Sequence, residues 1–435
     1  MLRVPRAPLG LLIMTSLVGT ATAVAFGGTA VAGTSGPIPA NVKVVSYTAT
    51  PETPAGFVTA AAQAAALVED NPSAYEGSYY DPDTKTVVLE ATTAARAVPS
   101  QAIVLKANPV IAVRTAHWSR ADAESRFADF LVAHQLTDRV MSWWVDPKTD
   151  GFQLFFIGQP SDADLASFSQ APGVVTLVAG MTDGGTTTDA MNDASPVAGG
   201  SRYYAARTGP VPFVATWDHR CTAGYGYKIG STNYILTAGH CFWRGITLWD
   251  EYWRATGPNN DPTFQAHMGD FGGKSTWDQD NGTVNAGDDN ALHGDLSLAN
   301  LTSEDKSAGD SIWVSNTDKR FVTAREAPAQ GNPVCRSGTT SWELCGFTIN
   351  ATNVNHTYSD GTTIKNGDFA QLQAHDTCVE PGDSGGPVYR RVGDSNATAV
   401  GVISGTFPIP HFGCNLVFTG VEEAIQAWGG GLNLH

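Results

Sequence analysis

The chain has 435 residues, of which 16% are charged and 46 are glycine, and its formal net charge is −16 at pH 7. This length allows two or three domains with separate cores. The low charge content and abundant glycine argue against a coiled coil or a disordered chain and favour a globular protein rich in strands and loops. The acidic balance argues against nucleic-acid binding and suits a soluble, exported protein.

Residues 1–32 have the features of a signal peptide. Arg3 and Arg6 precede an apolar run over residues 9–18, and small-residue cleavage options follow at residues 23–25 and 30–32. A membrane anchor is the alternative, but Thr, Ser and Gly interrupt the run, and no later segment is apolar enough to span a bilayer. We therefore predict a secreted, extracellular protein with no membrane partner once the signal is removed.

Residues 33–180 contain no cysteine and predict an α+β region. Apolar residues recur at helical spacing over residues 119–136, which predicts an amphipathic helix. Asp-Pro and Asp-Gly pairs within residues 146–151 predict a turn, and residues 152–157 then predict a strand.

Residues 181–196 form a linker of small residues, the kind of exposed sequence where proteolytic nicking concentrates. We predict maturation between about residues 185 and 197. Cleavage there would release a C-terminal domain over residues 197–435.

All six cysteines lie in this C-terminal part, and an even number in an exported chain predicts three disulfides. From the sequence alone fifteen pairings stay open. Metal binding is the alternative, but there is no Cys-x-x-Cys pair and the histidines do not cluster with the cysteines. We expect neither a metal nor another cofactor. The cysteines are Cys221, Cys241, Cys335, Cys345, Cys378 and Cys414.

Two motifs in this domain carry chemistry. Residues 382–387 read Gly-Asp-Ser-Gly-Gly-Pro around Ser384, and such glycines suit a turn whose N–H groups point toward an approaching substrate. Residues 234–237 predict a short buried strand that ends just before His240. Histidine suits the role of a base because its ordinary pKa lies near working pH, so it can accept the serine proton and return it.

Together, Thr-Ala-Gly-His-Cys at residues 237–241 and Gly-Asp-Ser-Gly-Gly-Pro resemble the chymotrypsin-like serine proteases. Cys-Val-Glu-Pro at residues 378–381 and Val-Cys-Arg-Ser-Gly at residues 334–338 resemble the secreted bacterial branch that includes the streptogrisins and α-lytic protease. The resemblance implies an all-β mature domain of two six-stranded antiparallel barrels, preceded by the α+β region. It also implies a secreted serine endopeptidase that cleaves peptide bonds through an acyl-enzyme.

The triad of the resembled family needs a carboxylate between the histidine and the serine. Asp295 fits best, because residues 295–299 alternate like the family's Asp-apolar-Ala-Leu pattern. The interval from His240 is longer than in the compact bacterial members, and a loop rich in Gly, Asn and Asp fills it. Three other acids in this interval therefore stay open as alternatives: Asp270, Asp288 and Asp289.

The resemblance also assigns supporting roles. The N–H groups of Gly382 and Ser384 would form the oxyanion hole, and Asp383 would pair with Arg336 in a buried ion pair that shapes the oxyanion loop. The implied disulfides are Cys221–Cys241, Cys335–Cys345 and Cys378–Cys414.

Substrate preference stays open between basic, apolar and acidic residues. Asp376 stands two residues before Cys378, the spacing at which trypsins carry the acid that selects Lys or Arg. Glu380, however, lengthens the loop before the serine as in streptogrisins. The far wall of the site would be Ser404, Gly405 and Thr406, whose backbone would pair with a peptide substrate as an added strand.

The segment Trp-Trp-Val-Asp-Pro at residues 143–147 is similar to part of the pro-regions of α-lytic-type proteases, and Val-Ala-Gly-Gly at residues 197–200 is similar to the start of mature members. We therefore expect a zymogen, monomeric, whose pro-region is an intramolecular folding partner. An ordinary α+β module is the alternative for residues 33–180.

Two other functions are alternatives for the whole chain. A non-catalytic homologue could use this fold as a binding module, although intact His240 and Ser384 argue against it. An α/β-hydrolase would place the acid and the histidine after the serine, which the order in this sequence contradicts.

Overall fold

The computed structural model describes residues 38–45, 52–93, 110–181, 197–207, 216–241, 250–255, 264–278, 281–287, 289–301, 308–315, 317–358, 361–372, 378–407 and 413–435. The chain divides into two units, Met1–Ala32 and Gly33–His435, and the expected signal peptide and the maturation segment lie outside the described residues. Within the described part, no helix is both long enough and apolar enough to cross a bilayer.

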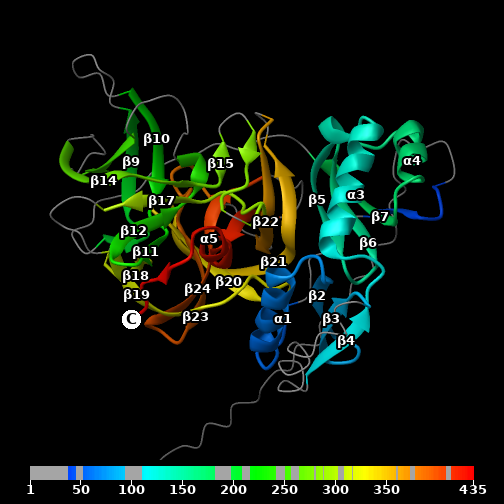
Figure 1. Ribbon diagram of the computed structural model, residues 1–435, viewed down its shortest axis with the longest axis horizontal. Helices are drawn as coiled ribbons and strands as arrows, with labels where there is room; N and C mark the ends of the chain where they lie inside the picture. Colours follow the sequence, from blue (N-terminus) through cyan, green and yellow to red (C-terminus); the bar gives the residue numbers. More distant parts are fainter. Residues whose placement is uncertain are drawn as a thin grey trace, which may run out of the picture. The chain divides into compact units, whose positions relative to one another are not determined.

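The C-terminal strands close into a six-stranded antiparallel barrel, in which each strand pairs with two neighbours in the order β20-β21-β22-β25-β24-β23 and back to β20 (Figure 1). The strands are β20 (Pro333–Gly338), β21 (Trp342–Thr357), β22 (Thr363–Leu372), β23 (Pro387–Val392), β24 (Asn396–Gly405) and β25 (Cys414–Gly420). Phe347, Leu416 and Phe418 are fully buried among other apolar residues inside it. This barrel confirms the all-β, chymotrypsin-like fold class.

Seven strands that precede the barrel in the chain, together with β26, which follows it, form an eight-stranded antiparallel sheet in the order β10-β9-β13-β14-β17-β12-β11-β26. Among the described residues, the first and last strands of this sheet do not pair with each other. The expected second barrel is therefore not seen as a closed one. The strands are β9 (Arg202–Arg207), β10 (Thr216–Thr222), β11 (Tyr225–Ile229), β12 (Thr232–Thr237), β13 (Asp250–Ala255), β14 (Phe264–Ser275), β17 (Ser297–Asn300) and β26 (Gly431–Leu432). The strand predicted over residues 234–237 is the end of β12.

Smaller elements connect these two sheets. Strand β18 pairs with β8 in parallel and with β19, and β19 pairs with β24 of the barrel. A helix that the sequence analysis did not predict, α5, follows β25 and buries Val421 and Ala424. The bounds are β8 (Val197–Gly199), β15 (Trp277–Asp278), β16 (Gly282–Thr283), β18 (Ala308–Trp313), β19 (Lys319–Arg325) and α5 (Val421–Trp428).

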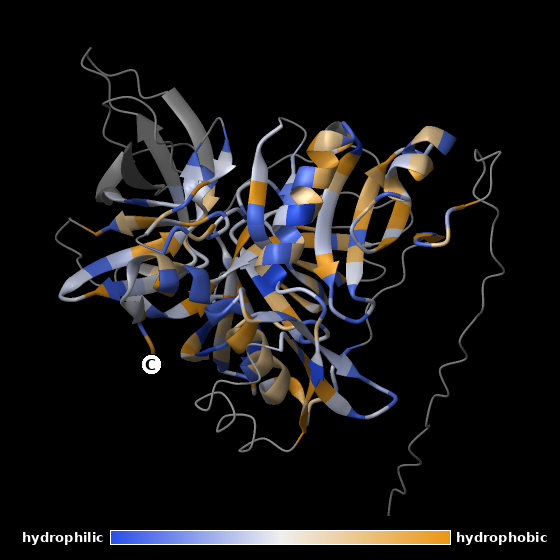
Figure 2. Ribbon diagram, turned by 45° about the vertical axis from the view of Figure 1, so that its right-hand side comes forward, coloured by the Kyte–Doolittle hydropathy of each residue, from blue (hydrophilic) through white to orange (hydrophobic). Residues whose placement is uncertain are grey.

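The N-terminal half has helices packed on two small groups of strands. The predicted helix is α3, whose first turn is capped by Ser119, since its hydroxyl accepts the N–H of Asp122 at 3.1 Å. The predicted strand is β6, and β6 and β7 carry mostly apolar residues (Figure 2). The elements are β1 (Val42–Val45), α1 (Val58–Asp70), β2 (Tyr75–Asp81), β3 (Thr86–Ala91), β4 (Ile111–Thr115), α3 (Arg120–Ala133), β5 (Val140–Asp146), β6 (Gly151–Ile157), α4 (Asp162–Phe168) and β7 (Val174–Met181).

Strand β5 of the N-terminal half pairs with β21 of the barrel, so one sheet runs through both (Figure 1). Trp143 stands opposite Asn355, and Ser142 opposite His356. The Ser142 hydroxyl lies 2.6 Å from His356 Nδ1, and burial lowers the pKa of His356 to about 3. The N-terminal half therefore covers the edge of β21 with both main-chain and side-chain contacts.

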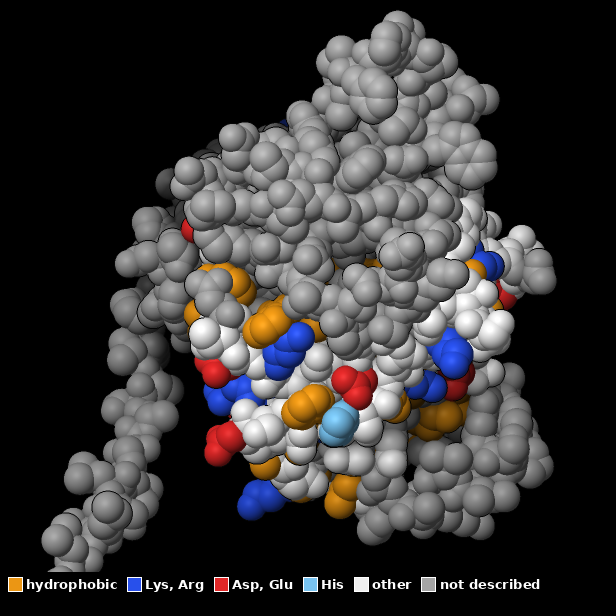
Figure 3. Space-filling model, turned by 90° about the vertical axis from the view of Figure 1, so that its left-hand side faces the viewer, with side chains coloured by type: hydrophobic (Ala, Val, Ile, Leu, Met, Phe, Trp, Pro, Cys, Tyr) orange, Lys and Arg blue, Asp and Glu red, His pale blue; other side chains and the backbone are white. Residues whose placement is uncertain are grey.

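The face shown in Figure 3 carries charged side chains of both signs, interspersed, with apolar side chains in small groups among its coloured residues.

Candidate active site

The first part of the site is His240, directly after β12 in a single turn over Gly239–Cys241. Gly239 leaves room for this turn, because a Cβ there would lie 2.6 Å from the Trp277 Cβ and 2.8 Å from the Leu296 carbonyl oxygen. The imidazole lies edge-on to Trp277, with ring centroids 6.0 Å apart. The strand end and this packing fix the ring while 27% of the side chain stays exposed.

The second part is Asp295, which is fully buried just before β17. Its Oδ2 lies 2.6 Å from His240 Nδ1, and its Oδ1 accepts the main-chain N–H of His240 at 2.7 Å. The hydroxyl of Ser404 also donates to Oδ2, and the Asp295 N–H donates to Thr419 Oγ1 at 3.0 Å. Because a carboxylate accepts, the proton of the imidazole lies on Nδ1, and Nε2 is left as the basic nitrogen.

The alternative acids have other positions. Asp289 accepts the N–H of Ala291 at 3.0 Å and lies 3.1 Å from Nε2 of His293, so it is part of a turn and not of the His240 contact. Asp288 and the side chain of Asp270 lie outside the described residues. Among the described acids, Asp295 is the one that touches His240 in the contacts given above.

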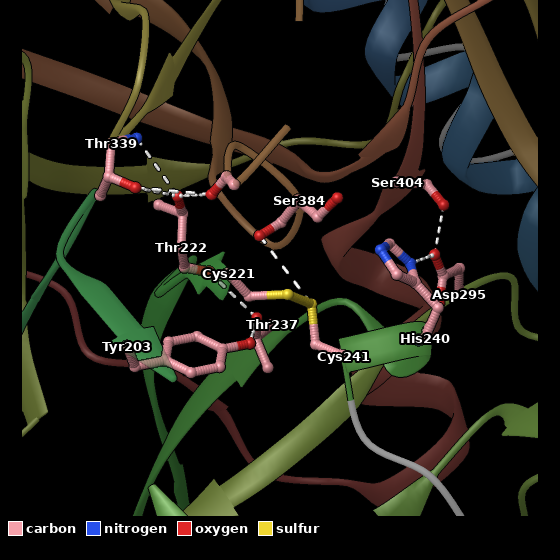
Figure 4. Close-up of a disulfide and its surroundings, with 11 residues drawn as sticks. Tyr203, Cys221, Thr222, Thr237, His240, Cys241, Asp295, Thr339, Ser384 and Ser404 are labelled. Atoms are coloured by element: carbon pink, nitrogen blue, oxygen red, sulfur yellow. Dashed lines mark hydrogen bonds and ion pairs between the residues drawn. A yellow bond between two sulfur atoms is a disulfide. The ribbon is translucent and has the colours of Figure 1, made fainter. Parts of the chain in front are cut away.

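The third part is Ser384, in the turn between Cys378 and β23. Gly382 and Gly385 have φ values of +101° and +86°, which favour glycine, and Ser384 stands between them. The main chain is held on both sides: the Ser384 carbonyl accepts the N–H of Thr222 at 2.7 Å, and the Gly385 N–H donates to Ile403 at 2.7 Å. In Figure 4 the Ser384 hydroxyl points to the side on which the His240 imidazole lies.

Threonine side chains hold the loop that precedes the serine. The Gly382 carbonyl accepts the hydroxyls of Thr222 at 2.5 Å and Thr339 at 3.4 Å, and these two hydroxyls lie 2.8 Å apart (Figure 4). Among the described residues, no hydrogen bond takes up the N–H of Gly382 or Ser384.

Asp383 is fully buried, and backbone groups satisfy its carboxylate. It accepts the N–H of Thr340 at 2.9 Å, of Ser341 at 3.3 Å and of Glu380 at 2.9 Å, together with the Ser341 hydroxyl. These donors stabilise the charged form of the carboxylate.

Arg336 lies 3.9 Å from the Asp383 carboxylate, at the outer limit of an ion pair. Its shorter contacts are donations to the carbonyls of Trp342 at 2.6 Å and Cys378 at 2.7 Å. Burial lowers the pKa of the Arg336 guanidinium, and Asp383 acts in the opposite direction. The arginine thus ties two chain segments together beside the oxyanion loop.

The three disulfides join the pairs that the resemblance implied: Cys221–Cys241, Cys335–Cys345 and Cys378–Cys414. The first joins β10 to the turn that carries His240, with the Cys241 sulfur 4.0 Å from the Ser384 carbonyl oxygen (Figure 4). Two clusters bring cysteine sulfur near His240 or Glu343, but these sulfurs are oxidised and are not thiolate ligands.

The structure describes all of the predicted substrate-binding residues except Asp376. Thr406 contacts Cys378 and Asn415, with its hydroxyl 3.3 Å from the Cys378 sulfur. The main-chain N–H of Glu380 donates to the Asp383 carboxylate, and the Ser404 hydroxyl points to Asp295 (Figure 4).

Several supporting residues were missed by the sequence analysis. Thr222, Thr339 and Thr419 reach the site across 43 to 160 positions of the chain, so no local motif could reveal them. His293 lies between Glu423 at 2.7 Å and Asp289, and although burial opposes its charge, these hydrogen bonds raise its pKa. The one sequence feature that could have indicated His293 is its position two residues before Asp295.

The closed barrel, together with a histidine–carboxylate pair facing a glycine-flanked serine, defines a serine protease of the chymotrypsin type. The family model described as Trypsin matches residues 204–428, which is more than half of the chain. The chain belongs to the trypsin family and is a serine endopeptidase.

Curated relatives extend the match beyond this domain. Streptogrisin-D of Streptomyces griseus is 27% identical over 353 residues, covering 81% of this chain and 74% of the relative. Streptogrisin-C of the same organism is 26% identical and covers 85% of this chain and 68% of the relative. Such coverage reaches well before residue 204. Among solved structures, Thermobifida fusca Protease A is 23% identical with a TM-score of 0.35, covering 55% of this chain and 98% of its own.

Proposed function

We propose that this endopeptidase is secreted and acts through a triad of Ser384, His240 and Asp295. The observation that carries the proposal is the 2.6 Å contact between His240 Nδ1 and Asp295 Oδ2, with the Ser384 hydroxyl on the imidazole side. His240 Nε2 takes the proton of Ser384 as its oxygen attacks the peptide carbonyl. His240 then gives that proton to the departing amine, and the acyl-enzyme is hydrolysed by water that His240 activates.

The oxyanion of each tetrahedral intermediate would be bound by the N–H groups of Gly382 and Ser384. The loop is preorganised for this role by Thr222 and Thr339 on the Gly382 carbonyl and by the donors on Asp383. Losing one such N–H donor typically costs about 2.7–4 kcal/mol of transition-state stabilisation.

We further propose that the protein is made as a pre-pro-protein. Residues 1–32 would be the signal peptide, residues 33–180 the pro-region and residues 181–196 the linker that is cleaved. The pairing of β5 with β21 and the coverage of the streptogrisins before residue 204 both support an N-terminal half that acts on the protease as its intramolecular partner. The released product, residues 197–435, would act as an extracellular monomer.

Protein or peptide substrates would lie along Ser404, Gly405 and Thr406, with the side chain before the cleaved bond near Glu380 and Asp376. The preference is decided by digesting a peptide library with the processed protein and comparing it with Asp376→Asn. A basic preference that Asp376→Asn abolishes would assign the selecting acid to Asp376. A preference that this variant leaves unchanged would assign it to other residues of the site.

The proposed function is tested by incubating the processed protein with a denatured protein substrate and identifying the new termini by mass spectrometry. Ser384→Ala is the control for a contaminating protease. Cleavage by the parent and none by Ser384→Ala is the expected result. No cleavage by a processed, disulfide-bonded parent would favour the binding-module alternative.

A further inference from the structure

A chain of hydroxyl groups lies behind the proposed triad acid. Ser404 is buried, and its hydroxyl donates to Asp295 Oδ2, the same oxygen that faces His240 Nδ1. The Ser404 oxygen also lies 3.0 Å from the hydroxyl of Tyr358. Because a serine hydroxyl has a single proton and Asp295 takes it, Tyr358 must be the donor in the second contact. The two hydrogen bonds therefore have the same direction: Tyr358 donates to Ser404, and Ser404 donates to Asp295.

The surroundings of Tyr358 hold its hydroxyl in this place. Tyr358 directly follows β21 in the turn to β22, where its N–H donates to Thr362 and its carbonyl accepts from Gly361, both at 2.9 Å. Its ring stands edge-on to His356, with centroids 4.7 Å apart and an interplanar angle of 89°. The ring and the main chain are thus fixed independently of Ser404.

Gly405 provides the space that the hydroxyl needs. A Cβ at this position would lie 2.8 Å from the Tyr358 oxygen and 3.2 Å from its Cε1. Contacts this short with a ring held by packing cannot be relieved without moving the tyrosine. The glycine after Ser404 therefore leaves room for the Tyr358 hydroxyl beside the Ser404 hydroxyl.

We propose that Tyr358 is a positioning residue for the triad, acting through the hydroxyl of Ser404 on the carboxylate of Asp295. Without a donor from Tyr358, the Ser404 hydroxyl is free to rotate away from Asp295, and hydrogen bonds in series also strengthen one another. The bond from Ser404 spreads the charge of Asp295 and orients the oxygen that faces His240. The inference rests on the proposed triad and adds a residue to it.

The test is Tyr358→Phe, which removes the hydroxyl and keeps the ring, made in the full chain and allowed to process. Rates are normalised by titrating active sites with a fluorophosphonate, so that inactive molecules do not count. We expect kcat to fall about three- to tenfold, with KM unchanged within about twofold. The acid limb of kcat/KM should move up by about half a pH unit, because a carboxylate with one donor fewer holds the His240 cation more strongly.

Ser404→Ala separates action through Ser404 from direct contact with the substrate. Ser404→Ala alone should move the acid limb in the same direction, and Tyr358→Phe should have no further effect in that background. A tyrosine that touched the substrate directly would instead raise KM and keep its effect without Ser404. The matched control is Tyr389→Phe, which removes a buried hydroxyl 2.6 Å from Glu343 and should leave the acid limb unchanged.

Two results would overturn the inference alone: an active parent whose kcat and acid limb are unchanged by Tyr358→Phe, or effects of Tyr358→Phe and Ser404→Ala that add. A parent in which Ser384 is not labelled and nothing is cleaved would overturn the proposed triad, and the role of Tyr358 with it. The inference is supported if Tyr358→Phe shifts the acid limb of kcat/KM in the parent chain and causes no shift in the Ser404→Ala background.

Discussion

Asp295 accepts both the ring N–H and the main-chain N–H of His240, so its replacement should change the tautomer and the orientation of the imidazole. In Asp295→Asn an amide can donate to Nδ1, which favours the wrong tautomer and leaves Nε2 protonated. We expect kcat to fall about 10⁴-fold. Asp289→Asn is the control, because Asp289 contacts Ala291 and His293 instead, and it should keep kcat within about threefold. A large loss in Asp289→Asn together with a small one in Asp295→Asn would reverse the assignment.

Arg336 and Arg391 allow the stability contribution of a buried arginine to be compared with that of an exposed one. Each lies 3.9 Å from a carboxylate, but the Arg336 side chain is 1% exposed and the Arg391 side chain 44%. Arg336→Ala would leave two carbonyls without their donor and Asp383 without its nearest cation. We expect it to cost about 3–5 kcal/mol of stability, whereas Arg391→Ala should cost less than about 1 kcal/mol.

The measurement is thermal unfolding of the uncleaved chain in the Ser384→Ala background, where self-cleavage does not interfere. Equal unfolding temperatures for Arg336→Ala and its parent would contradict a structural role for this arginine.

At this scale the sequence predicted the three residues that we propose as the triad, but not the residues that hold them in place. His240 and Ser384 stand in local motifs, and Asp295 heads a recognisable strand. Thr222, Thr339 and Tyr358 act on the site through contacts that form only when distant strands pair. A single hydroxyl in such a position has no pattern of its own, so only the fold could place it.

At the scale of elements, the contact between the N-terminal half and the protease buries carboxyl groups from both. Glu69 on α1 and Asp368 on β22 are buried and close enough to influence each other. Burial raises the pKa of both groups, Glu423 on α5 raises them further, and Arg120 on α3 lowers them. Glu422 on α5 also raises the pKa of Glu69, and Glu124 on α3 lies 3.7 Å from Arg120.

A carboxyl group whose pKa is raised by folding stabilises the folded state most when it is protonated. That contribution is complete below the pKa of the unfolded chain, about 4, and is lost as the pH rises through the higher pKa of the folded state. We therefore expect Asp368→Asn, which does not titrate, to gain stability relative to its parent as the pH rises from 5 to 8.

Thermal unfolding of the uncleaved Ser384→Ala chain at several pH values measures this difference. Asp129→Asn, on the exposed side of α3, is the matched control for the substitution itself. A pH-independent difference for Asp368→Asn would contradict the buried-carboxyl account of this contact.

Elements with strong local patterns were predicted, and others were not. The helical spacing that predicted α3 is reinforced by its Ser119 cap, and the turn before β6 has its own sequence signature. Helix α1 is built largely from alanine, which marks no clear apolar face, and α5 is only eight residues long. The parallel pairing of β18 with β8 joins residues more than a hundred positions apart, beyond the reach of local periodicity.

At the scale of the whole molecule, closing the barrel requires strands that are far apart in the chain, such as β20 with β23 and β22 with β25. Such topologies fold slowly, and the N-terminal half contributes a paired strand to the edge of β21. We expect residues 197–435, expressed alone and refolded from denaturant, to recover little activity. Residues 33–180 added separately should increase the yield of active protein.

Active sites recovered after refolding, counted by covalent titration, measure this effect. Ready refolding of residues 197–435 to full activity would contradict the folding role proposed for the N-terminal half.

The central claim is an assembled nucleophile at Ser384, and the most direct measurement is reaction of the processed, secreted protein with a fluorophosphonate probe. The labelled residue is mapped by mass spectrometry, with Ser384→Ala alongside. We expect a single modified residue, Ser384, and no labelling of Ser384→Ala. A correctly processed protein with its three disulfides formed that takes up no label, or takes it up at another serine, would contradict the account.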